Sequence, residues 1–518
     1  MEPVRLLTKS LFQNGLRCFR LLWFRVQRPE QFSEESPSQA QRDGIAIGDL
    51  AKCLHPSGVE IDWSIFSKGL RDTQLGMDRR RILFEAGFVA NGCHARADIL
   101  LPGERDGSWD IWEVKSSSLD PEEEGARAEV RRFQLYDLAF QKFCYTAAGV
   151  SIGRTGLLLL NKDYVRYGEL HPAQLFLEKD ETESVDALLP SLPPLVEEMQ
   201  KILGQEDEPP IAIQWNCRKN GRRENRCDCR ENCPLKEECW TRAGIGAENI
   251  TILPRFRGAG HLERGIWNLS DFQDRDTLSE GQKIVFDGAR SGKIRLVGPA
   301  IRDWLGALEY PIHYLDFETF ASPIPPFDGT HAYSRIPFQF SLHVQRLPGE
   351  KLEQMGFLAR DRDDPRPNFL KALHRHCEDR GSVIVYNAAF EKSILRELGE
   401  CFPDWRSWTE ELGGRIVDLY EIFRQYHYYS PAQLGSRSIK KVLPALTGQS
   451  YCALRIGNGE DAMGEYRRVT FSDATADERE EVYSALEEYC ALDTRAMADI
   501  ISALGAILSP DYPCNGAE

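Results

Sequence analysis

The chain of 518 residues lacks a long apolar segment. No run of apolar residues approaches the roughly 20 that a membrane-spanning helix needs. The N-terminal residues Met1–Arg5 also lack the apolar stretch and cleavage site of a secretory signal peptide. These two absences argue against a membrane protein or a secreted one, so we expect a cytoplasmic protein.

The sequence also lacks a surplus of positive charge, with 64 basic and 80 acidic residues and a formal net charge of −16. Nucleic-acid partners usually need a basic surface, so this balance argues weakly against them. Carboxylates that bind a metal ion are neutralised by it, however. Basic residues are also dense in one short segment, which we interpret as a nucleic-acid surface: Arg218, Lys219, Arg222, Arg223, Arg226 and Arg230.

The length of the chain and the order of its segments predict an α/β protein with more than one domain. Three segments with strand patterns form a meander, and a helical pattern follows at 122–148. After Ile312, strand and helix patterns alternate, with helices expected at 416–425, 436–445 and 476–506. Residues 29–46 are polar and suggest a loop. We expect domains at 1–240 and 306–508, joined by a linker or small helical region at 241–305.

A first group of acidic residues lies on the strands of the meander. Asp98 ends one strand, and Glu113 and Lys115 share one face of the next because strand residues two apart point the same way. Two carboxylates can hold Mg²⁺ or Mn²⁺, and a lysine can position the attacking water. Glu85, one strand earlier, offers a further carboxylate. Alone, Asp98 or Glu113-Val-Lys115 would be a weak signal, compatible with a surface ion pair.

This group resembles the PD-(D/E)XK nucleases of the RecB-like branch. The match consists of Asp98, the Glu113-Val-Lys115 triplet, and the later pair Gln141 and Tyr145, which lie one helical turn apart. The resemblance implies a restriction-endonuclease-like domain in which these residues form a catalytic site.

Five of the 14 cysteines fall in a short window, and no Cys-x-x-Cys pair of the kind common in zinc sites occurs there. Zinc or unligated thiols remain alternatives. The segment resembles RecB-like nucleases that carry a [4Fe-4S] cluster, with one ligand before the nuclease core and three after it. The resemblance implies Cys18, Cys233 and Cys239 as ligands. Cys227 and Cys229 compete about equally for the remaining position, with Cys217 behind them.

A second group of acidic residues begins in the strand-like run that contains Asp316 and Glu318, two carboxylates on one face. Tyr489 and Asp493 lie one turn apart on a predicted helix. Converging carboxylates can hold two metal ions that act on the attacking and leaving oxygens of a phosphodiester. The alternative is a chance strand and an ordinary helix surface.

The second group resembles the DEDDy exonucleases, which have the ribonuclease-H-like fold. Asp316-Phe-Glu318 matches their first motif, Asn387 to Glu391 the second, and Tyr489 to Asp493 the third. The second motif normally ends in Asp, so Glu391 is a departure that can misplace a ligand by about an ångström. Asp418 is a substitute carboxylate, although a role at a helix N-terminus fits it better.

Together the two resemblances imply a bacterial fusion of a RecB-like iron–sulfur nuclease module with a DEDDy-type exonuclease module. We expect a nuclease, dependent on Mg²⁺ or Mn²⁺, that cleaves DNA in repair, recombination or defence. A catalytically impaired nucleic-acid-binding or scaffold protein and an RNA-processing 3′–5′ exonuclease are the alternatives. The departure at Glu391 and the net acidity favour the first alternative.

Overall fold

The structure is a computed structural model that describes residues 5–32, 38–119, 128–213 and 233–509. Two compact units divide the chain. Unit 1 comprises Met1–Gly244 with Ser322–Tyr333, and unit 2 comprises Ile245–Ala321 with Ser334–Glu518. The expected domain boundaries differ from this division in two ways: residues 245–305 belong to unit 2, and the short segment Ser322–Tyr333 belongs to unit 1.

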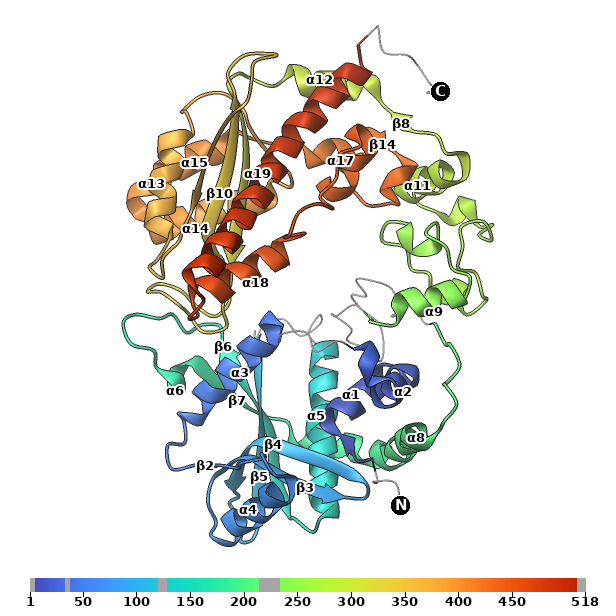
Figure 1. Cartoon of the computed structure of the whole chain (residues 1–518), viewed down its shortest axis with the longest axis vertical. Coiled ribbons are helices and arrows are strands. Elements are labelled where there is room, and N and C mark those ends of the chain that lie inside the picture. The colour runs from blue at the N-terminus through green and yellow to red at the C-terminus, as the bar shows by residue number, and fades with distance from the viewer. Residues whose placement is uncertain (1–4, 33–37, 120–127, 214–232, 510–518) are drawn as a thin grey trace. The chain divides into compact units, whose positions relative to one another are not determined.

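Unit 1 contains one mixed sheet with the strand order β2-β3-β4-β5-β6-β7, and β1 pairs with β4 (Figure 1). Neighbours from β3 to β5 are antiparallel, whereas β5 and β6 are parallel. The strands are β1 (Leu7–Thr8), β2 (Val59–Glu60), β3 (Leu83–Ala90), β4 (Cys93–Pro102), β5 (Trp109–Leu119), β6 (Ile152–Asn161) and β7 (Phe176–Asp180).

Helices cover both faces of this sheet. Helices α1, α5 and α8 contribute to the core on one face, and α3 packs on the other face. The helices are α1 (Lys9–Arg17), α2 (Phe19–Gln27), α3 (Gln39–Lys52), α4 (Phe66–Asp78), α5 (Ala128–Ala147), α6 (Pro172–Leu175), α7 (Thr182–Leu188), α8 (Leu192–Gly204) and α9 (Lys236–Arg242).

Unit 2 contains a five-stranded sheet with the order β11-β10-β9-β12-β13. Strand β10 runs antiparallel to β9 and β11, and β12 runs parallel to β9 and β13. The strands are β9 (Ile312–Phe320), β10 (Ile336–Gln345), β11 (Glu353–Leu358), β12 (Val383–Val385) and β13 (Ile416–Asp418); β8 (Arg295–Leu296) and β14 (Tyr428–Tyr429) form a separate pair.

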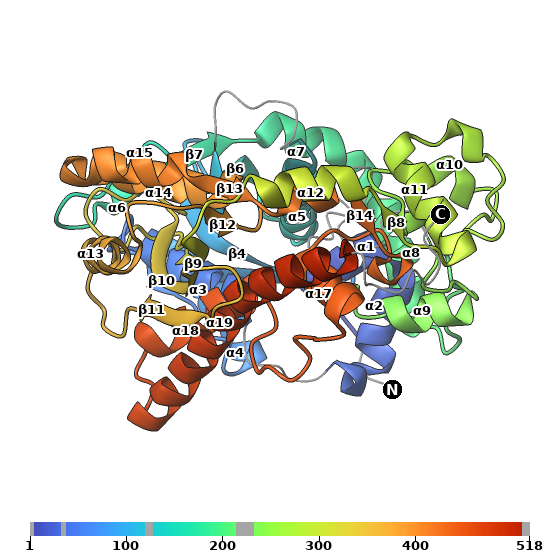
Figure 2. The ribbon, with the colours of Figure 1, turned by 90° about the horizontal axis from the view of Figure 1, so that it is seen from above.

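The helices of unit 2 sandwich its five-stranded sheet, with α13, α14 and α15 on one side and α18 and α19 on the other (Figures 1 and 2). The order of the strands and helices makes this unit an α/β structure. The helices are α10 (Ala259–Leu262), α11 (Glu280–Ser291), α12 (Gly298–Gly306), α13 (Arg366–His376), α14 (Ala389–Cys401), α15 (Arg406–Gly414), α16 (Tyr420–Arg424), α17 (Ile439–Thr447), α18 (Gly459–Thr470) and α19 (Ala476–Ile507).

Two expectations about local structure are wrong. The polar loop expected at 29–46 ends early, because Ser38 and Gln41 form a reciprocal capping box that starts α3 at Gln39. The helix expected at 416–425 begins instead with strand β13, which extends the sheet through parallel pairing with β12. Short β-branched runs such as Ile416-Val417 fit either structure until a neighbouring strand is known.

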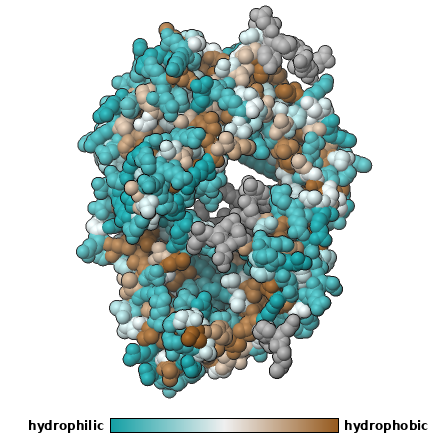
Figure 3. Space-filling view, in the orientation of Figure 1, coloured by the Kyte–Doolittle hydropathy of each residue, from teal (hydrophilic) through white to brown (hydrophobic). Residues whose placement is uncertain are grey.

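None of the described helices combines the length and the apolar character needed to cross a membrane. On the face of each unit seen in Figure 3, hydrophilic side chains predominate and apolar ones form smaller groups between them.

The segment 245–305 is fastened to the rest of unit 2 by a close backbone approach at Gly435. This glycine has a φ of +74°, and a Cβ placed on it would lie 1.9 Å from the carbonyl oxygen of Ile252. Gly448, which ends α17, has a similar φ of +77° but has no atom within 4 Å of such a Cβ. Substitution of the two glycines therefore distinguishes the cost of the backbone conformation, which both share, from the cost of steric overlap, which only Gly435 has.

We expect Gly435→Ala to destabilise unit 2 by about 3 kcal/mol or more, because it adds an atomic overlap to the left-handed backbone conformation. Gly448→Ala, the matched control, should cost about 1 kcal/mol, from the backbone conformation alone. Denaturant unfolding of both variants and the wild type measures the difference. Equal losses in the two variants would show that the close approach to Ile252 adds no steric cost at Gly435.

Candidate active sites

Strands β3 and β4 of unit 1 lose their regular alternation where the first acidic residues lie. Leu83 and Ala86 both contribute to the core on the α5 face, although residues three apart on a regular strand point to opposite faces. Between them, Glu85 has a φ of +57°, in the left-handed region. Asp98 lies across from Glu85, between the pairs Phe84 with Ile99 and Ala86 with Ala97, in the β3–β4 register. The irregular backbone therefore lies at two of the predicted carboxylates.

The pairing of β4 with β5 ends one step before the carboxylates of Asp98 and Glu113. Its last pair on this side is Ile99 with Trp112, so Asp98 and Glu113 would be opposite each other in the next pair. Instead of a backbone partner, the amide of Val114 donates to Oδ2 of Asp98 at 2.8 Å. The two acidic side chains therefore lie where the strands separate.

Glu113 is the centre of the unit 1 site and is only 2% exposed. Its Oε1 accepts hydrogen bonds from Nζ of Lys9 at 2.7 Å and from Nζ of Lys115 at 2.8 Å. Its Oε2 accepts from Nε2 of Gln141 at 2.7 Å. Lys115 also pairs with the buried Asp137 at 2.7 Å. Two predicted residues, Lys115 of β5 and Gln141 of α5, thus bind the carboxylate of Glu113.

Opposing charges set the protonation of this site. Burial acts to raise the pKa of Glu113, but the ammonium groups of Lys115 and Lys9 outweigh it and lower that pKa to about 2. Burial, followed by the charge of Glu113, raises the pKa of Asp98 to about 7. The surroundings therefore favour the ionised form of Glu113 and the protonated form of Asp98.

Two members of this site, Lys9 and Asp137, escaped the sequence analysis. Asp137 precedes Gln141 by four residues on α5, so the helical period that joins Gln141 with Tyr145 would also have indicated it. Lys9 lies in the N-terminal segment, 104 residues before Glu113. Its place in the site depends on tertiary structure alone, and no local pattern signals it.

Tyr145 and Glu85 lie beside the group around Glu113 and have other contacts. The Tyr145 hydroxyl accepts a hydrogen bond from the amide of Ala97 at 3.0 Å and donates one to the carbonyl oxygen of Ala86. Tyr145 therefore braces the irregular part of β3 and β4. Glu85 lies 3.7 Å from Arg96. Burial raises the pKa of Glu85.

Three of the predicted cluster ligands, Cys18, Cys233 and Cys239, pack against one apolar group of unit 1. The buried members of that group are Leu21, Trp23, Phe24 and Leu235. Cys18 sits at the junction of α1 and α2. Burial raises the pKa of Cys233 and of Cys239, and the nearby Cys18 adds to both shifts. The competing ligands, Cys217, Cys227 and Cys229, and the basic segment Arg218–Arg230 lie outside the described residues.

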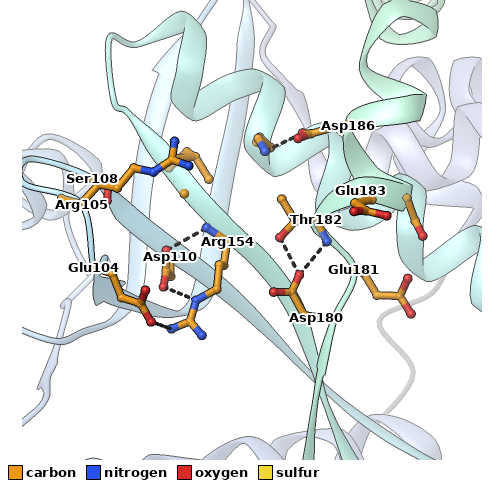
Figure 4. A pocket seen from close by; sticks show the side chains of 14 residues that line it. Glu104, Arg105, Ser108, Asp110, Arg154, Asp180, Glu181, Thr182, Glu183 and Asp186 are labelled. Atoms are coloured by element: carbon orange, nitrogen blue, oxygen red, sulfur yellow. Dashed lines mark hydrogen bonds and ion pairs between the residues drawn. The ribbon is translucent and has the colours of Figure 1, made fainter.

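A pocket of about 760 Å³ in unit 1 lies apart from these predicted residues, beside the start of β5 and β6 (Figure 4). Six acidic and three basic side chains line it, and some of them form ion pairs. Asp110 binds the amide and the guanidinium of Arg154 at 2.8 and 2.9 Å, and Lys142 lies 2.5 Å from Asp186. None of the predicted catalytic residues or cluster ligands lines this pocket, so we assign it no role.

In unit 2, alternation along β9 divides apolar and acidic residues between the two faces of the sheet. Leu315 and Phe317 join the core with α13 and α14. Asp316 and Glu318 point to the other face, where α19 packs across β9 and β10. Ser341 of β10, in register with Asp316, is bonded to Thr494 of α19 at 2.8 Å. The two carboxylates therefore face α19.

Asp493 of α19 completes a compact group with Asp316 and Glu318. Each residue offers one oxygen, and these oxygens all lie within 4.8 Å of one another. Among the described residues, only this group brings three such ligand atoms so close together. All its donors are carboxylate oxygens, which are the ligands that Mg²⁺ and Mn²⁺ take. The donor set therefore fits a divalent cation.

Lys440 and Tyr451 lie beside this group, and no sequence pattern indicated either of them. The Tyr451 hydroxyl donates to Oδ1 of Asp493 at 2.6 Å. Nζ of Lys440 donates to the Tyr489 hydroxyl at 3.0 Å and to the carbonyl oxygen of Gly457 at 2.7 Å. Tyr489, the tyrosine of the third motif, is therefore held by a lysine on α17.

Glu391 lies in the first turn of α14, directly after β12, and is 2% exposed. Its Oε2 has no hydrogen-bond partner among the described residues. It adds to the electrostatic repulsion at Asp316, although the group within 4.8 Å excludes it. Asp418 instead accepts the amides of Asn387 at 2.9 Å and Tyr420 at 3.0 Å, which is a role at helix starts.

Burial and mutual repulsion disfavour the ionised forms of the acidic site residues in unit 2. Burial, and then the charges of Asp493 and Glu318, raises the pKa of Asp316 well above its ordinary range. Burial and Asp493 raise the pKa of Glu318 to about 8. Burial, followed by Asp418 and Glu318, raises the pKa of Glu391 to about 8. A divalent cation would relieve this repulsion, and without one these groups hold protons.

One family model matches the chain. Its description is "Domain of unknown function (DUF2779)", and it matches residues 313–438, which include Asp316, Glu318 and Glu391 and end before Tyr489 and Asp493. Neither the curated proteins nor the solved structures contain a match to the chain.

The raised pKa values predict that unit 2 loses stability as the pH rises. The ordinary pKa of Glu318 is 4.5 and its folded value is about 8, so the folded state keeps a proton that the unfolded state has lost between these values. Stability must fall with pH over that window. Ca²⁺ should remove the loss by replacing the proton, so it should raise the melting temperature more at pH 8.5 than at pH 6.

Thermal melts from pH 5 to 9, with and without Ca²⁺, measure this effect. Glu318→Gln, which cannot ionise, should flatten the pH dependence and reduce the response to Ca²⁺. Glu465→Gln is the matched control, because Glu465 is paired with Arg468 on α18 and lies outside the acidic group. Identical pH profiles for Glu318→Gln and the wild type would contradict the assignment.

Proposed function

We propose that this chain is a metal-dependent nuclease that hydrolyses DNA phosphodiesters and has one site in each unit. The observation that carries the proposal is the convergence of Asp316, Glu318 and Asp493, three oxygens within 4.8 Å on one face of a sheet. Buried carboxylates repel one another, and holding them together disfavours folding unless a cation binds. Such a group is therefore more consistent with metal binding than with a structural role.

The strand arrangement of unit 2 supports a ribonuclease-H-like exonuclease fold. The central strand β9 has antiparallel neighbours on one side and parallel strands on the other, in the order β11-β10-β9-β12-β13. The motif residues lie on β9, at the start of α14 and on α19. This placement agrees with the resemblance to DEDDy enzymes. Glu391 occupies the position at which their second motif has Asp.

The order of elements in unit 1 supports a restriction-endonuclease-like core. A helix, three antiparallel strands, a second helix and a parallel strand follow in sequence as α4, β3, β4, β5, α5 and β6. Asp98 and Glu113 lie where β4 and β5 separate, and Lys115 lies two residues further along β5. The group around Glu113 therefore agrees with the resemblance to RecB-like nucleases.

Divalent cations bound at these carboxylates would act as Lewis acids on the phosphodiester. In unit 2, Asp316, Glu318 and Asp493 would hold them, and Lys440 would fix the Tyr489 hydroxyl so that it orients the attacking water. In unit 1, Asp98 and Glu113 would hold the cation. Lys115, anchored by Asp137, would offset the negative charge that develops on the phosphate.

We also propose a [4Fe-4S] cluster held by Cys18, Cys233, Cys239 and one cysteine of the segment outside the described residues. The three described thiols are far apart in the sequence, one before β2 and two after β7, and pack against the same apolar group. Metal–thiolate bonds at this place would join α1 to the segment before α9 and close a long loop. Reduced thiols of this kind suit the cytoplasm, where we place the protein.

Nucleic-acid binding without cleavage is a second candidate function, and Glu391 favours it for unit 2. The carboxylate of Glu391 is buried, its Oε2 has no hydrogen-bond partner among the described residues, and it does not join the group of three oxygens. RNA is the alternative substrate for this unit, since DEDDy domains also act on RNA.

Cleavage of end-labelled single-stranded DNA and RNA with Mn²⁺ tests the proposal. We expect Lys115→Ala and Asp316→Ala each to lose the activity of its own unit by about 100-fold or more. Lys142→Ala and Glu465→Gln are matched controls outside the two sites. If the wild type binds but does not cut DNA or RNA with any divalent cation, the binding protein becomes the better description.

Iron and sulfide analysis of anaerobically purified protein tests the cluster. We expect about four iron atoms per chain, with a brown chromophore. Cys18→Ser, Cys233→Ser and Cys239→Ser should each lose the iron, because each removes a thiolate ligand. Cys53→Ser, which changes an exposed cysteine on the same unit, should retain it. Bound zinc in place of iron would overturn the cluster assignment.

A further inference from the structure

The carboxylate of Glu113 is already occupied by three hydrogen-bond donors. Lys9 and Lys115 share Oε1, and Gln141 takes Oε2. A carboxylate offers about four acceptor positions, and a cation such as Mg²⁺ approaches an oxygen to about 2.1 Å. Two ammonium groups at 2.7 and 2.8 Å leave little room on Oε1. A cation that binds Oε1 of Glu113 must therefore displace one of these donors.

Lys9 is the donor that can move without leaving a buried group unpaired. Lys115 is also bound to the buried Asp137 at 2.7 Å, so a movement away from Glu113 would weaken a second, buried ion pair. Gln141 is fully buried, so its amide would lose its partner inside the protein. The Lys9 side chain is 26% exposed, and both of its ion-pair partners, Glu113 and Asp98, are predicted cation ligands.

The backbone of Lys9 is fixed, so a displaced side chain would stay at the site. Lys9 is the first residue of α1, which Thr8 caps by accepting the amide of Leu11. The preceding strand β1 pairs with β4, the strand that carries Asp98. One turn later, Gln13 donates to Asp137 at 2.8 Å. A displaced ammonium group of Lys9 would therefore remain beside Asp98 and Glu113.

We propose that Lys9 is a phosphate-binding residue of the unit 1 site. Its ammonium group neutralises Glu113 and Asp98 while they are free and turns to a backbone phosphate of the nucleic acid when these carboxylates hold a divalent cation. Lys9 should therefore have opposite effects on the affinity for the cation and on the affinity for nucleic acid. Lys9 competes with the cation for the carboxylates, and Lys9 strengthens the binding of nucleic acid. This inference rests on the proposed nuclease function of unit 1.

The test compares Lys9→Met, Lys9→Arg and Lys142→Met. Lys142 is the matched control, because it is a lysine of unit 1 that is paired with Asp186, outside the site. All proteins carry Asp316→Asn and Asp493→Asn, so that unit 2 contributes little metal binding. Calorimetric titration with Mn²⁺ gives metal affinity. Binding of labelled single-stranded DNA in Ca²⁺ gives nucleic-acid affinity, and cleavage in Mn²⁺ gives kcat and KM.

We expect Lys9→Met to bind Mn²⁺ about fivefold more tightly, because a competing positive charge is gone. We expect it to bind DNA about fivefold more weakly and to raise KM, while Lys9→Arg restores DNA binding. Unchanged Mn²⁺ and DNA affinities in Lys9→Met, with cleavage by the parent protein intact, would overturn the role of Lys9 alone. Absence of Lys115-dependent cleavage in the parent protein would overturn the nuclease function of unit 1 and this inference with it.

Discussion

Repulsion between buried carboxylates is the constraint on which both candidate sites depend. In unit 1 the negative charge of Glu113 is balanced by Lys9 and Lys115, which keep it ionised. In unit 2 the half-buried Lys440 is the lysine that acts on Glu318, and burial with mutual repulsion favours the protonated forms of Asp316 and Glu318. The repulsion is thus offset by two lysine side chains at Glu113, whereas at Asp316 and Glu318 it favours protonation.

The backbone places the acidic residues differently in the two units. In unit 1 the backbone itself is irregular: Glu85 breaks the alternation of β3, and Asp98 accepts the amide of Val114 where the ladder ends. In unit 2 the side chains of β9 keep their alternation, although β10 has a register shift opposite Glu318 and Thr319, and the period of two separates apolar Leu315 from acidic Asp316. A regular strand is easier to interpret from sequence than an irregular one.

This difference explains how much could be predicted. The strands around Asp98, Glu113 and Asp316 follow from local patterns, as does the shared face of Tyr489 and Asp493. Lys9, Lys440 and Tyr451 could not be predicted, because each reaches its site through tertiary contacts across 104, 49 and 42 residues. Strand β13 was expected to be helical, because only its pairing with β12 distinguishes the two structures.

The segment Ser322–Tyr333 shows that the two units are not consecutive pieces of chain. Its flanking strands β9 and β10 belong to unit 2, yet Ala332 contributes to a core of unit 1, and Arg166 donates to the carbonyl oxygens of Pro325 and Pro326 at 3.0 and 2.8 Å. A single cut after Gly244 would therefore deprive unit 1 of part of its own interior. Because unit 1 needs this loop, the two units cannot be inherited, exchanged or expressed as independent modules, although each carries its own candidate site.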